Sequence, residues 1–389
     1  MNPRKMKALP ILALGLLLST AAGAEQELQL GYVFDGWNSN SLYHGTENRI
    51  PLSYYYSAKD FLLTVNTAFV TGDYEQDADA TQGITGASFN SSQFTDTTLG
   101  LNLGLDMGGS VKSTFSGSLN LPTGNDNWEI AEEVGAIPFI FEPGYYHGAG
   151  WGGNLFYTLS ASTTGMEYGL GGGFMSTGNY DTGLSTEGTF SPGNNFVALA
   201  TVGFQMSPSE SWSFRYVRTF PMESTYDNAA TDFTEGPGNI LTTQWFSQMG
   251  GDRLVLNASY SFYGTGQTAQ TTAPYSLTPD PGSYFGDKLE LHPIFGYSMG
   301  PGVVLESGLM MDWIQPNGYP QGQTVSVAGY QGGGILLGAE QSLTFQLSQS
   351  TFWNLAGLFH SIANDGAGVG NTTITYNRFS IGTNVGFKW

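Results

Sequence analysis

The four histidines are the side chains of this sequence best suited to acid–base or nucleophilic catalysis. His44 and His147 lie in segments with the composition of long loops, His292 precedes Pro293 within a strand pattern, and His360 ends another strand. A hydrolase needs such a histidine beside a serine or a carboxylate. Neither loop histidine adjoins a recognised motif such as G-x-S-x-G or H-E-x-x-H. We therefore predict that the protein is not an enzyme.

A run of alternating acidic residues also has the composition of a metal site. Asp73, Glu75, Asp77 and Asp79 lack the glycine and the terminal glutamate of an EF-hand calcium loop, so a solvated acidic loop is predicted and no metal is assigned. The chain has no cysteine. This excludes disulfides, thiolate zinc sites and covalent haem attachment through C-x-x-C-H. We expect no cofactor.

The elements that carry the remaining polar residues are strands, because apolar residues recur at every second position. In the last strand one face holds Phe379, Ile381, Thr383, Val385, Phe387 and Trp389. Residues 98–107 and 110–121 alternate in the same way. This period is typical of strands with one apolar and one polar face. A soluble β-sandwich alternates too, so the connections must distinguish the two classes.

The connections favour a membrane barrel. About 16 strands are expected, starting near residues 28, 50, 61, 98, 111, 151, 166, 196, 212, 240, 254, 289, 303, 332, 351 and 373. Short turns and long loops alternate strictly between them, as in bacterial outer-membrane barrels with periplasmic turns and outer loops. Lipid offers no partner for unpaired backbone groups, so the sheet must close. We predict an all-β fold, a transmembrane antiparallel up-and-down barrel over residues 25–389, with 14–18 strands compatible with the pattern.

The N-terminus predicts export. Three basic residues within positions 4–7 precede an apolar core at Leu9–Leu18, and Ala22-Gly23-Ala24 fits a small-x-small cleavage site. Residues 1–24 therefore read as a cleaved signal peptide. The alternative, a membrane anchor, needs about 20 apolar residues. Cleavage removes three of 12 basic residues and none of 32 acidic ones, leaving a net charge of −23, and so acidic a chain predicts no nucleic-acid partner.

Two segments resemble known proteins. The strand Thr373–Trp389 ends on an aromatic residue preceded by apolar residues at alternate positions, with Phe379, Ile381, Val385, Phe387 and Trp389 on that face. It resembles the C-terminal signal of bacterial outer-membrane proteins, which implies recognition by the barrel-assembly machinery and location in the cell outer membrane. Ser118–Gly124 resembles the K/L-x-P-T-G-D segment of the transporter family grouped with the MetA phenol-degradation pathway. This chain departs from that pattern by placing Asn125 before Asp126.

A barrel of this size encloses water, because its wall side chains cannot fill the interior. The alternation predicts that seven charged residues line the lumen: Lys112, Glu167, Arg215, Glu306, Asp312, Arg378 and Lys388. Each is also compatible with an exposed charge near a strand end. Charged rings set ion selectivity in pores. Since basic residues are sparse and the loops acidic, we predict a porin-like channel for small solutes or ions that prefers cations.

The third long loop, Pro122–Gly150, is unusual for its apolar second half, Gly135–Phe141. Its first half carries the carboxylates of Asp126, Glu129, Glu132 and Glu133. Loops freely exposed to water seldom hold such an apolar run. Two interpretations stay open: a loop that folds into the barrel and forms a constriction, by analogy with the third loop of trimeric porins, or a short extra strand above the membrane.

Two other functions also stay open. One is a scaffold or sheath barrel that houses a partner such as a multihaem cytochrome in an electron-conduit complex. The other is a transporter for hydrophobic or aromatic compounds. The expected surroundings are outer-membrane lipid and lipopolysaccharide, the barrel-assembly machinery, and either a homotrimer or a periplasmic or extracellular partner protein.

Overall fold

A computed structural model gives the fold for most of the chain. It describes residues 24–39, 43–76, 87–121, 123–124, 152–177, 180–181, 189–191, 194–222, 225–226, 233–234, 236–269, 277–283, 286–316, 324–325, 328–329, 333–364 and 374–389. The predicted signal peptide apart from Ala24, and the predicted constriction residues Asp126, Glu129, Glu132 and Glu133, lie outside these residues. None of the described segments forms a helix long and apolar enough to cross a membrane.

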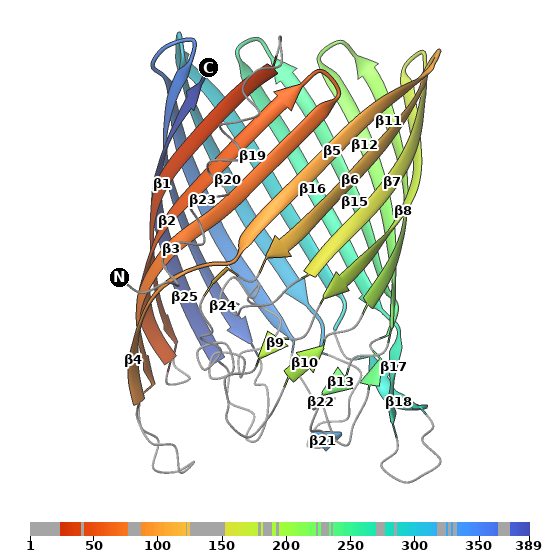
Figure 1. Cartoon of the computed structure of the whole chain (residues 1–389), viewed down its shortest axis with the longest axis vertical. Coiled ribbons are helices and arrows are strands. Elements are labelled where there is room, and N and C mark those ends of the chain that lie inside the picture. Colours follow the sequence, from red (N-terminus) through yellow and green to blue (C-terminus); the bar gives the residue numbers. More distant parts are fainter. Residues whose placement is uncertain are drawn as a thin grey trace.

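The described strands form one closed antiparallel barrel (Figure 1). Its strands are β1 (Ala24–Ser39), β2 (Tyr43–Ala58), β3 (Phe61–Gln76), β4 (Ala87–Phe94), β5 (Thr97–Gly108), β6 (Val111–Leu121), β7 (Gly152–Thr163), β8 (Met166–Thr177), β11 (Asn194–Ser207), β12 (Glu210–Pro221), β15 (Gly238–Met249), β16 (Asp252–Tyr263), β19 (Lys288–Gly300), β20 (Val303–Ile314), β23 (Gly334–Gln346), β24 (Thr351–Asn364) and β25 (Ile374–Lys388). These 17 segments fill 16 positions, because β4 and β5 pair with the two successive parts of β3. The predicted fold class and strand number are confirmed.

Closure takes place between the first and the last strand. β1 and β25 pair from Glu27↔Lys388 to Ser39↔Tyr376. Next to the Glu27↔Lys388 pair, at the C-terminal end of β25, Trp389 and Gln26 exchange two backbone hydrogen bonds of 3.0 and 3.1 Å. The ring of 16 strand positions therefore closes on itself, as lipid requires.

The turns sort to the two ends of the barrel as predicted. The tight turns lie at the end that carries the C-terminus, whereas the long connections lie at the other end (Figure 1). Glycines make the sharpest tight turns, for example Gly108 and Gly109 with φ of 92° and 67°, a region that favours glycine. Among the long connections lie the short strands β9 (Tyr180–Asp181), β10 (Thr189–Ser191), β13 (Thr225–Tyr226), β14 (Phe233–Thr234), β17 (Thr265–Ala269), β18 (Leu277–Ser283), β21 (Thr324–Val325) and β22 (Ala328–Gly329).

One predicted loop is in part a strand hairpin. Residues 71–93 read as a loop, but β3 continues to Gln76 and β4 begins at Ala87. Asp73 and Glu75 therefore lie in paired strand, and Glu75 Oε2 lies 2.8 Å from His44 Nε2. The prediction was wrong because the hairpin extends beyond the apolar belt, where both faces of a strand meet water and apolar alternation is lost.

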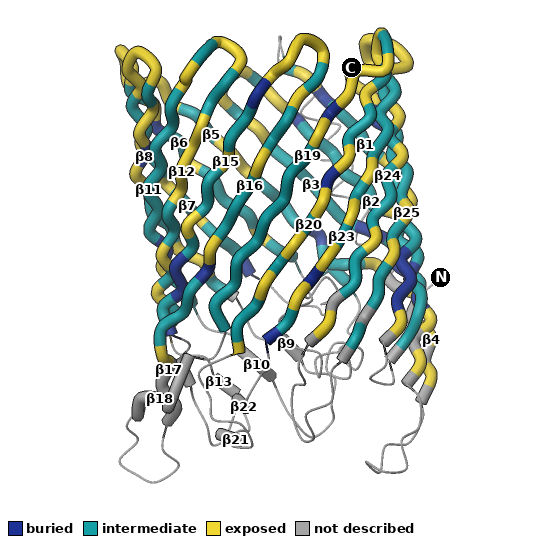
Figure 2. The backbone as a smooth tube through the Cα atoms, turned by 180° about the vertical axis from the view of Figure 1, so that it is seen from behind, coloured by how far each residue is buried: buried dark blue, intermediate teal, exposed yellow. Residues whose placement is uncertain are grey.

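The two faces of the wall differ in chemistry. The outer face exposes large apolar side chains on every part of the barrel, such as Leu170, Leu309 and Ile381. Exposed positions alternate with less exposed ones along the strands (Figure 2). The opposite, inner face carries most of the charged strand residues, among them the fully buried Glu47 and Asp35. Apolar side chains outside and polar ones inside are the pattern of a barrel that spans lipid around an aqueous interior.

Candidate functional site

The candidate site is the inner wall of the barrel, where all seven predicted lumen residues lie. Lys112, Glu167, Arg215, Glu306, Asp312, Arg378 and Lys388 share the strand face opposite to the exposed apolar residues. Lys112 faces Asp106 across the β5–β6 pair, and Lys388 Nζ lies 3.3 Å from Glu27 Oε2. That these residues line a path for solutes stays a prediction.

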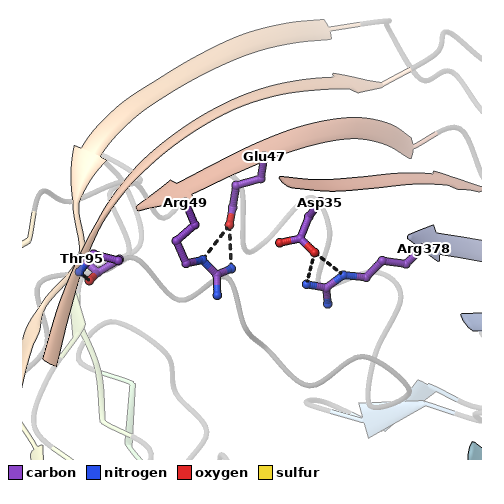
Figure 3. A network of polar contacts seen from close by, with 6 residues as sticks. Asp35, Glu47, Arg49, Thr95 and Arg378 are labelled. Atoms are coloured by element: carbon purple, nitrogen blue, oxygen red, sulfur yellow. Dashed lines mark hydrogen bonds and ion pairs between the residues drawn. The ribbon is translucent and has the colours of Figure 1, made fainter. Parts of the chain in front are cut away.

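The most deeply buried charges lie where β25, β1 and β2 meet (Figure 3). Arg378 donates from Nε and Nη2 to Asp35 Oδ1 at 3.2 and 2.9 Å. On the neighbouring strand Arg49 donates from Nε and Nη2 to Glu47 Oε1 at 3.2 and 2.7 Å. The carboxylates are 1% and 0% exposed. A buried carboxylate is tolerated only with such charge-assisted bonds. The Asp35–Arg378 pair joins β1 to β25 across the seam of the barrel, whereas the Glu47–Arg49 pair lies within β2.

A second charged group follows β19 and β20 toward the end with the long connections. Lys288 Nζ lies 2.6 Å from Glu290 Oε1 and 3.0 Å from Asp312 Oδ2. Glu290 and Asp312 are directly opposite each other in the strand register. One ammonium group thus contacts two carboxylates, so the three side chains together carry one net negative charge.

Two side-chain contacts of the inner wall cross an intervening strand, and glycine on that strand makes each crossing possible. Arg253 on β16 reaches Glu306 on β20 over Gly296 of β19, with a 3.0 Å contact from Nε to Oε1. Glu340 on β23 reaches His292 on β19 at 2.9 Å. It crosses Gly308, where an added Cβ would lie 2.6 Å from Glu340 Oε1.

Together these residues form a column of carboxylates on β19, β20 and β23, which we call the acidic column. Its members are Glu306, Glu340, Glu290 and Asp312. Along β20 alone, Asp312 lies six positions after Glu306, which is about 20 Å at roughly 3.3 Å per residue. Against four carboxylates stand two permanent cations, Arg253 and Lys288. The acidic column therefore carries an excess of negative charge along much of the lumen.

The wall from β5 to β12 is different. Its inner face is made mainly of serine, threonine, asparagine and glycine, with the row Gly169, Gly171 and Gly173 on β8. Glu167 and Arg215 are the predicted lumen residues on β8 and β12. Small uncharged side chains leave space on this side, so the charge of the lumen is concentrated on the opposite side.

Sequence reasoning missed most partners in these clusters. Asp35, Glu47, Arg49, Lys288 and Glu340 all lie on the polar face of a predicted strand or its extension, as did the residues that were chosen. The same alternation would have found them, because each lies an odd number of positions from an apolar outer-face residue. Glu340 lies three positions after Leu337, and Lys288 lies one position before Leu289.

Among the described residues, which do not include His147, the histidines and one serine motif show no catalytic arrangement. His44 and His292 contact glutamates. Gly296-Tyr297-Ser298-Met299-Gly300 matches G-x-S-x-G, but that motif acts at a strand-to-helix turn, whereas Ser298 pairs with Val304 inside a hairpin. Among the described residues no group of three or more His, Asp or Glu could hold a metal. That the chain is not an enzyme stays a prediction.

The residues of the predicted assembly signal lie on the outer face of β25 and just after it. Phe379, Ile381, Phe387 and Trp389 are exposed there, and Val385 shares their face. Recognition of this strand by the assembly machinery stays a prediction.

Comparison with known proteins assigns the chain to no family. No family model matches the chain, and no curated protein matches it. The resemblance to the MetA-pathway transporters therefore stays a prediction.

Similar solved structures include one named as an outer membrane protein, opdK from Pseudomonas aeruginosa, which is 8% identical, with coverage of 94% and 99% and a TM-score of 0.44. Acinetobacter baumannii OccAB3 is 9% identical, with 95% of this chain and 100% of that chain covered and a TM-score of 0.48. Pseudomonas aeruginosa OccK7 (OpdD) is 11% identical, with coverage of 95% and 99% and a TM-score of 0.46. The P. putida toluene transporter TodX is 9% identical, with coverage of 96% and 91% and a TM-score of 0.42. Such values identify no substrate for this chain.

The class follows from the strands themselves. A closed barrel of 16 antiparallel strands, apolar outside and polar inside, with tight turns at one end and long connections at the other, is the architecture of outer-membrane channels. The chain is an outer-membrane β-barrel of the porin and channel type.

Proposed function

We propose that the protein is a channel for small solutes and ions and that it prefers cations. The acidic column supports the preference: Glu306, Glu340, Glu290 and Asp312 follow one side of the lumen, and among the described residues their permanent countercharges are Arg253 of β16 and Lys288 of β19. Rings and rows of carboxylates in a pore favour cations over anions.

The spacing of the acidic column makes its charges act together. At 0.15 M salt the Debye length is about 8 Å. In the strand register Glu340 lies opposite Gly308, two positions from Glu306 and four positions from Asp312, which is about 7 and 13 Å at roughly 3.3 Å per residue. Every point between two members therefore lies within about one Debye length of a carboxylate. A cation that moves along this side therefore stays within the field of at least one carboxylate.

The polar side of the wall supports an aqueous path. The small side chains of β5 to β8 hydrogen-bond to one another, for example Asn154 Nδ2 to Ser118 Oγ at 2.7 Å and Thr98 Oγ1 to Asn120 Oδ1 at 3.1 Å. Such a surface is wettable and holds few fixed charges. The charged residues on the opposite side of the lumen therefore determine whether cations or anions pass more readily.

The third long loop adds to the proposal. If it folds inward, the carboxylates of Asp126, Glu129, Glu132 and Glu133 add negative charge at a narrow point of the path. Changing Glu129, Glu132 and Glu133 to glutamine then lowers the cation preference without altering the barrel strands. An unchanged reversal potential in that variant removes the loop from the proposal and leaves the acidic column as its basis.

Reversal potentials across planar bilayers under a salt gradient test the acidic column. Glu340→Gln removes one negative charge and keeps a side chain of the same size, so the cation preference should fall. Glu75→Gln is the matched control, because Glu75 lies on the outer face of the β3 extension beside His44. Equal reversal potentials in all three proteins would contradict the role of the column. A pure protein that does not conduct would favour a plugged or sheath barrel.

A further inference from the structure

The outer face of the barrel carries an apolar groove over β11, β12, β15, β16 and β19. Its volume is about 510 Å³. One side is lined by Tyr216, Leu241 and Tyr260, and the other by Phe214, Thr243 and Ala258. These two rows flank the inner-facing row Thr201–Arg215–Thr242–Ser259, whose backbone forms the floor. The groove therefore opens toward lipid and not toward the lumen.

Hydrogen bonds on one side and an aromatic contact on the other tilt the two rows of side chains away from each other. The hydroxyl of Tyr216 donates to Asn239 Oδ1 at 2.7 Å, and that of Tyr260 donates to Asp287 Oδ2 at 2.8 Å. Both acceptors lie nearer the end with the long connections. On the other side, the ring of Phe214 contacts that of Trp212, with centroids 5.1 Å apart. The rings thus lean in opposite directions along the barrel, and the groove stays open between them.

A single cation lies beside the groove on the outer face. Arg218 lies two positions after Tyr216 on β12, so both are on the outer face. It is opposite Asn239 in the strand register, and its side chain is exposed. Its guanidinium carbon lies 4.9 Å from the ring centroid of Phe220, which points it toward the end with the long connections. On the strands that the structure describes, Arg218 is the one lysine or arginine on the outer face, because the other basic strand residues lie on the inner face.

An exposed arginine above an apolar groove fits an anionic lipid. The apolar rows accept an acyl chain, and a guanidinium makes charge-assisted bonds to a phosphate at the membrane interface. Asp287, at the far end of the groove, is three strands from Arg218, which is about 14 Å at roughly 4.8 Å per strand. It therefore does not oppose a phosphate at Arg218.

We propose that this groove and Arg218 form a binding site for lipid A, the phosphorylated and acylated part of lipopolysaccharide. The position commits the site to this lipid, because long connections mark the outer end of such barrels and lipopolysaccharide occupies the outer leaflet. One acyl chain lies between the two rows, and one phosphate contacts Arg218. The site is independent of conduction through the lumen.

Titration of the refolded full-length barrel in detergent with purified lipid A tests the site. Arg218→Gln should weaken binding about tenfold, which corresponds to about 1.4 kcal/mol. Ala258→Phe should fill the groove and weaken binding to a similar extent. The matched controls are Lys59→Gln, in a tight turn, and Ala339→Phe, on the outer face of β23. Both controls should bind lipid A as the unchanged protein does. Heat-modifiable migration on gels checks that every variant is folded.

Three results would overturn the proposal. The first is lipid A binding that is unchanged in both Arg218→Gln and Ala258→Phe. The second is phosphatidylglycerol binding that matches lipid A in strength and in sensitivity to both changes, which would make the groove a general phospholipid site. The third is an oligomer that Ala258→Phe dissociates while lipid A binding stays the same, which would assign the groove to a second copy of the chain.

Discussion

Replacing Asp35 by asparagine removes one negative charge from the seam at which the first and the last strand of the barrel meet. The carboxylate is 1% exposed, and the side chain of its partner Arg378 is 21% exposed. Removing one member of a buried ion pair costs about 3–5 kcal/mol, because the other charge stays buried without its partner. Since the guanidinium keeps some contact with solvent, we expect the lower end of this range, about 3 kcal/mol.

The assay is urea unfolding of the refolded barrel in detergent, followed by tryptophan fluorescence. The midpoint should fall and the slope should stay the same, because the surface exposed on unfolding does not change. The matched control is Glu27→Gln. Glu27 and Lys388 also join β1 to β25, at 3.3 Å, but Lys388 is 51% exposed. Exposed pairs contribute about 0–1 kcal/mol, so this variant should unfold almost as the unchanged protein does.

The double variant Asp35→Asn, Arg378→Gln completes the test. If the loss comes from a guanidinium that has lost the Asp35 carboxylate, the double variant should be more stable than Asp35→Asn alone, since both charges of the pair are then removed. Strictly additive losses, or a loss in Asp35→Asn no larger than in Glu27→Gln, would refute the reasoning.

Further predictions concern assembly, orientation and the acidic column. Replacing Phe387 and Trp389 together by alanine should block assembly, because each buries apolar surface worth about 1.5–3 kcal/mol at the lipid face; a normal amount of heat-modifiable barrel would contradict this. Tags in residues 77–86 should be reachable on intact cells, and tags in the tight turn between β19 and β20 should not; the reverse labelling would overturn the orientation. Gly308→Ala should displace the Glu340 carboxylate, since the new Cβ would lie 2.6 Å from Oε1, and reversal potentials should then shift toward those of Glu340→Gln, whereas an unchanged potential would count against the crossing.

The barrel could be predicted because lipid imposes one rule on every strand. Phe379, Ile381 and Val385 are apolar for the same reason as Leu99 and Leu101, so period two recurs along the chain and marks the strands. Beyond the apolar belt this rule ends. The extension of β3 to Gln76 and its pairing with β4 were missed for that reason.

The inner wall could be predicted only as a list of positions. Alternation places Glu306 and Asp312 on the polar face, but it does not say which residues meet. Arg253 finds Glu306 across β19, and Glu340 finds His292 across β20, contacts that depend on the register of three strands and on glycine in the middle one. Such pairings bring together residues about 50 positions apart, and no local pattern signals them.

Single-channel recording of the pure, unchanged barrel in a planar bilayer, with a KCl gradient across it, tests the central claim most directly. The proposed channel should conduct, and its reversal potential should have the sign of a pore that passes K⁺ more readily than Cl⁻. Absence of conductance, or a reversal potential of the opposite sign, would contradict a cation-preferring channel.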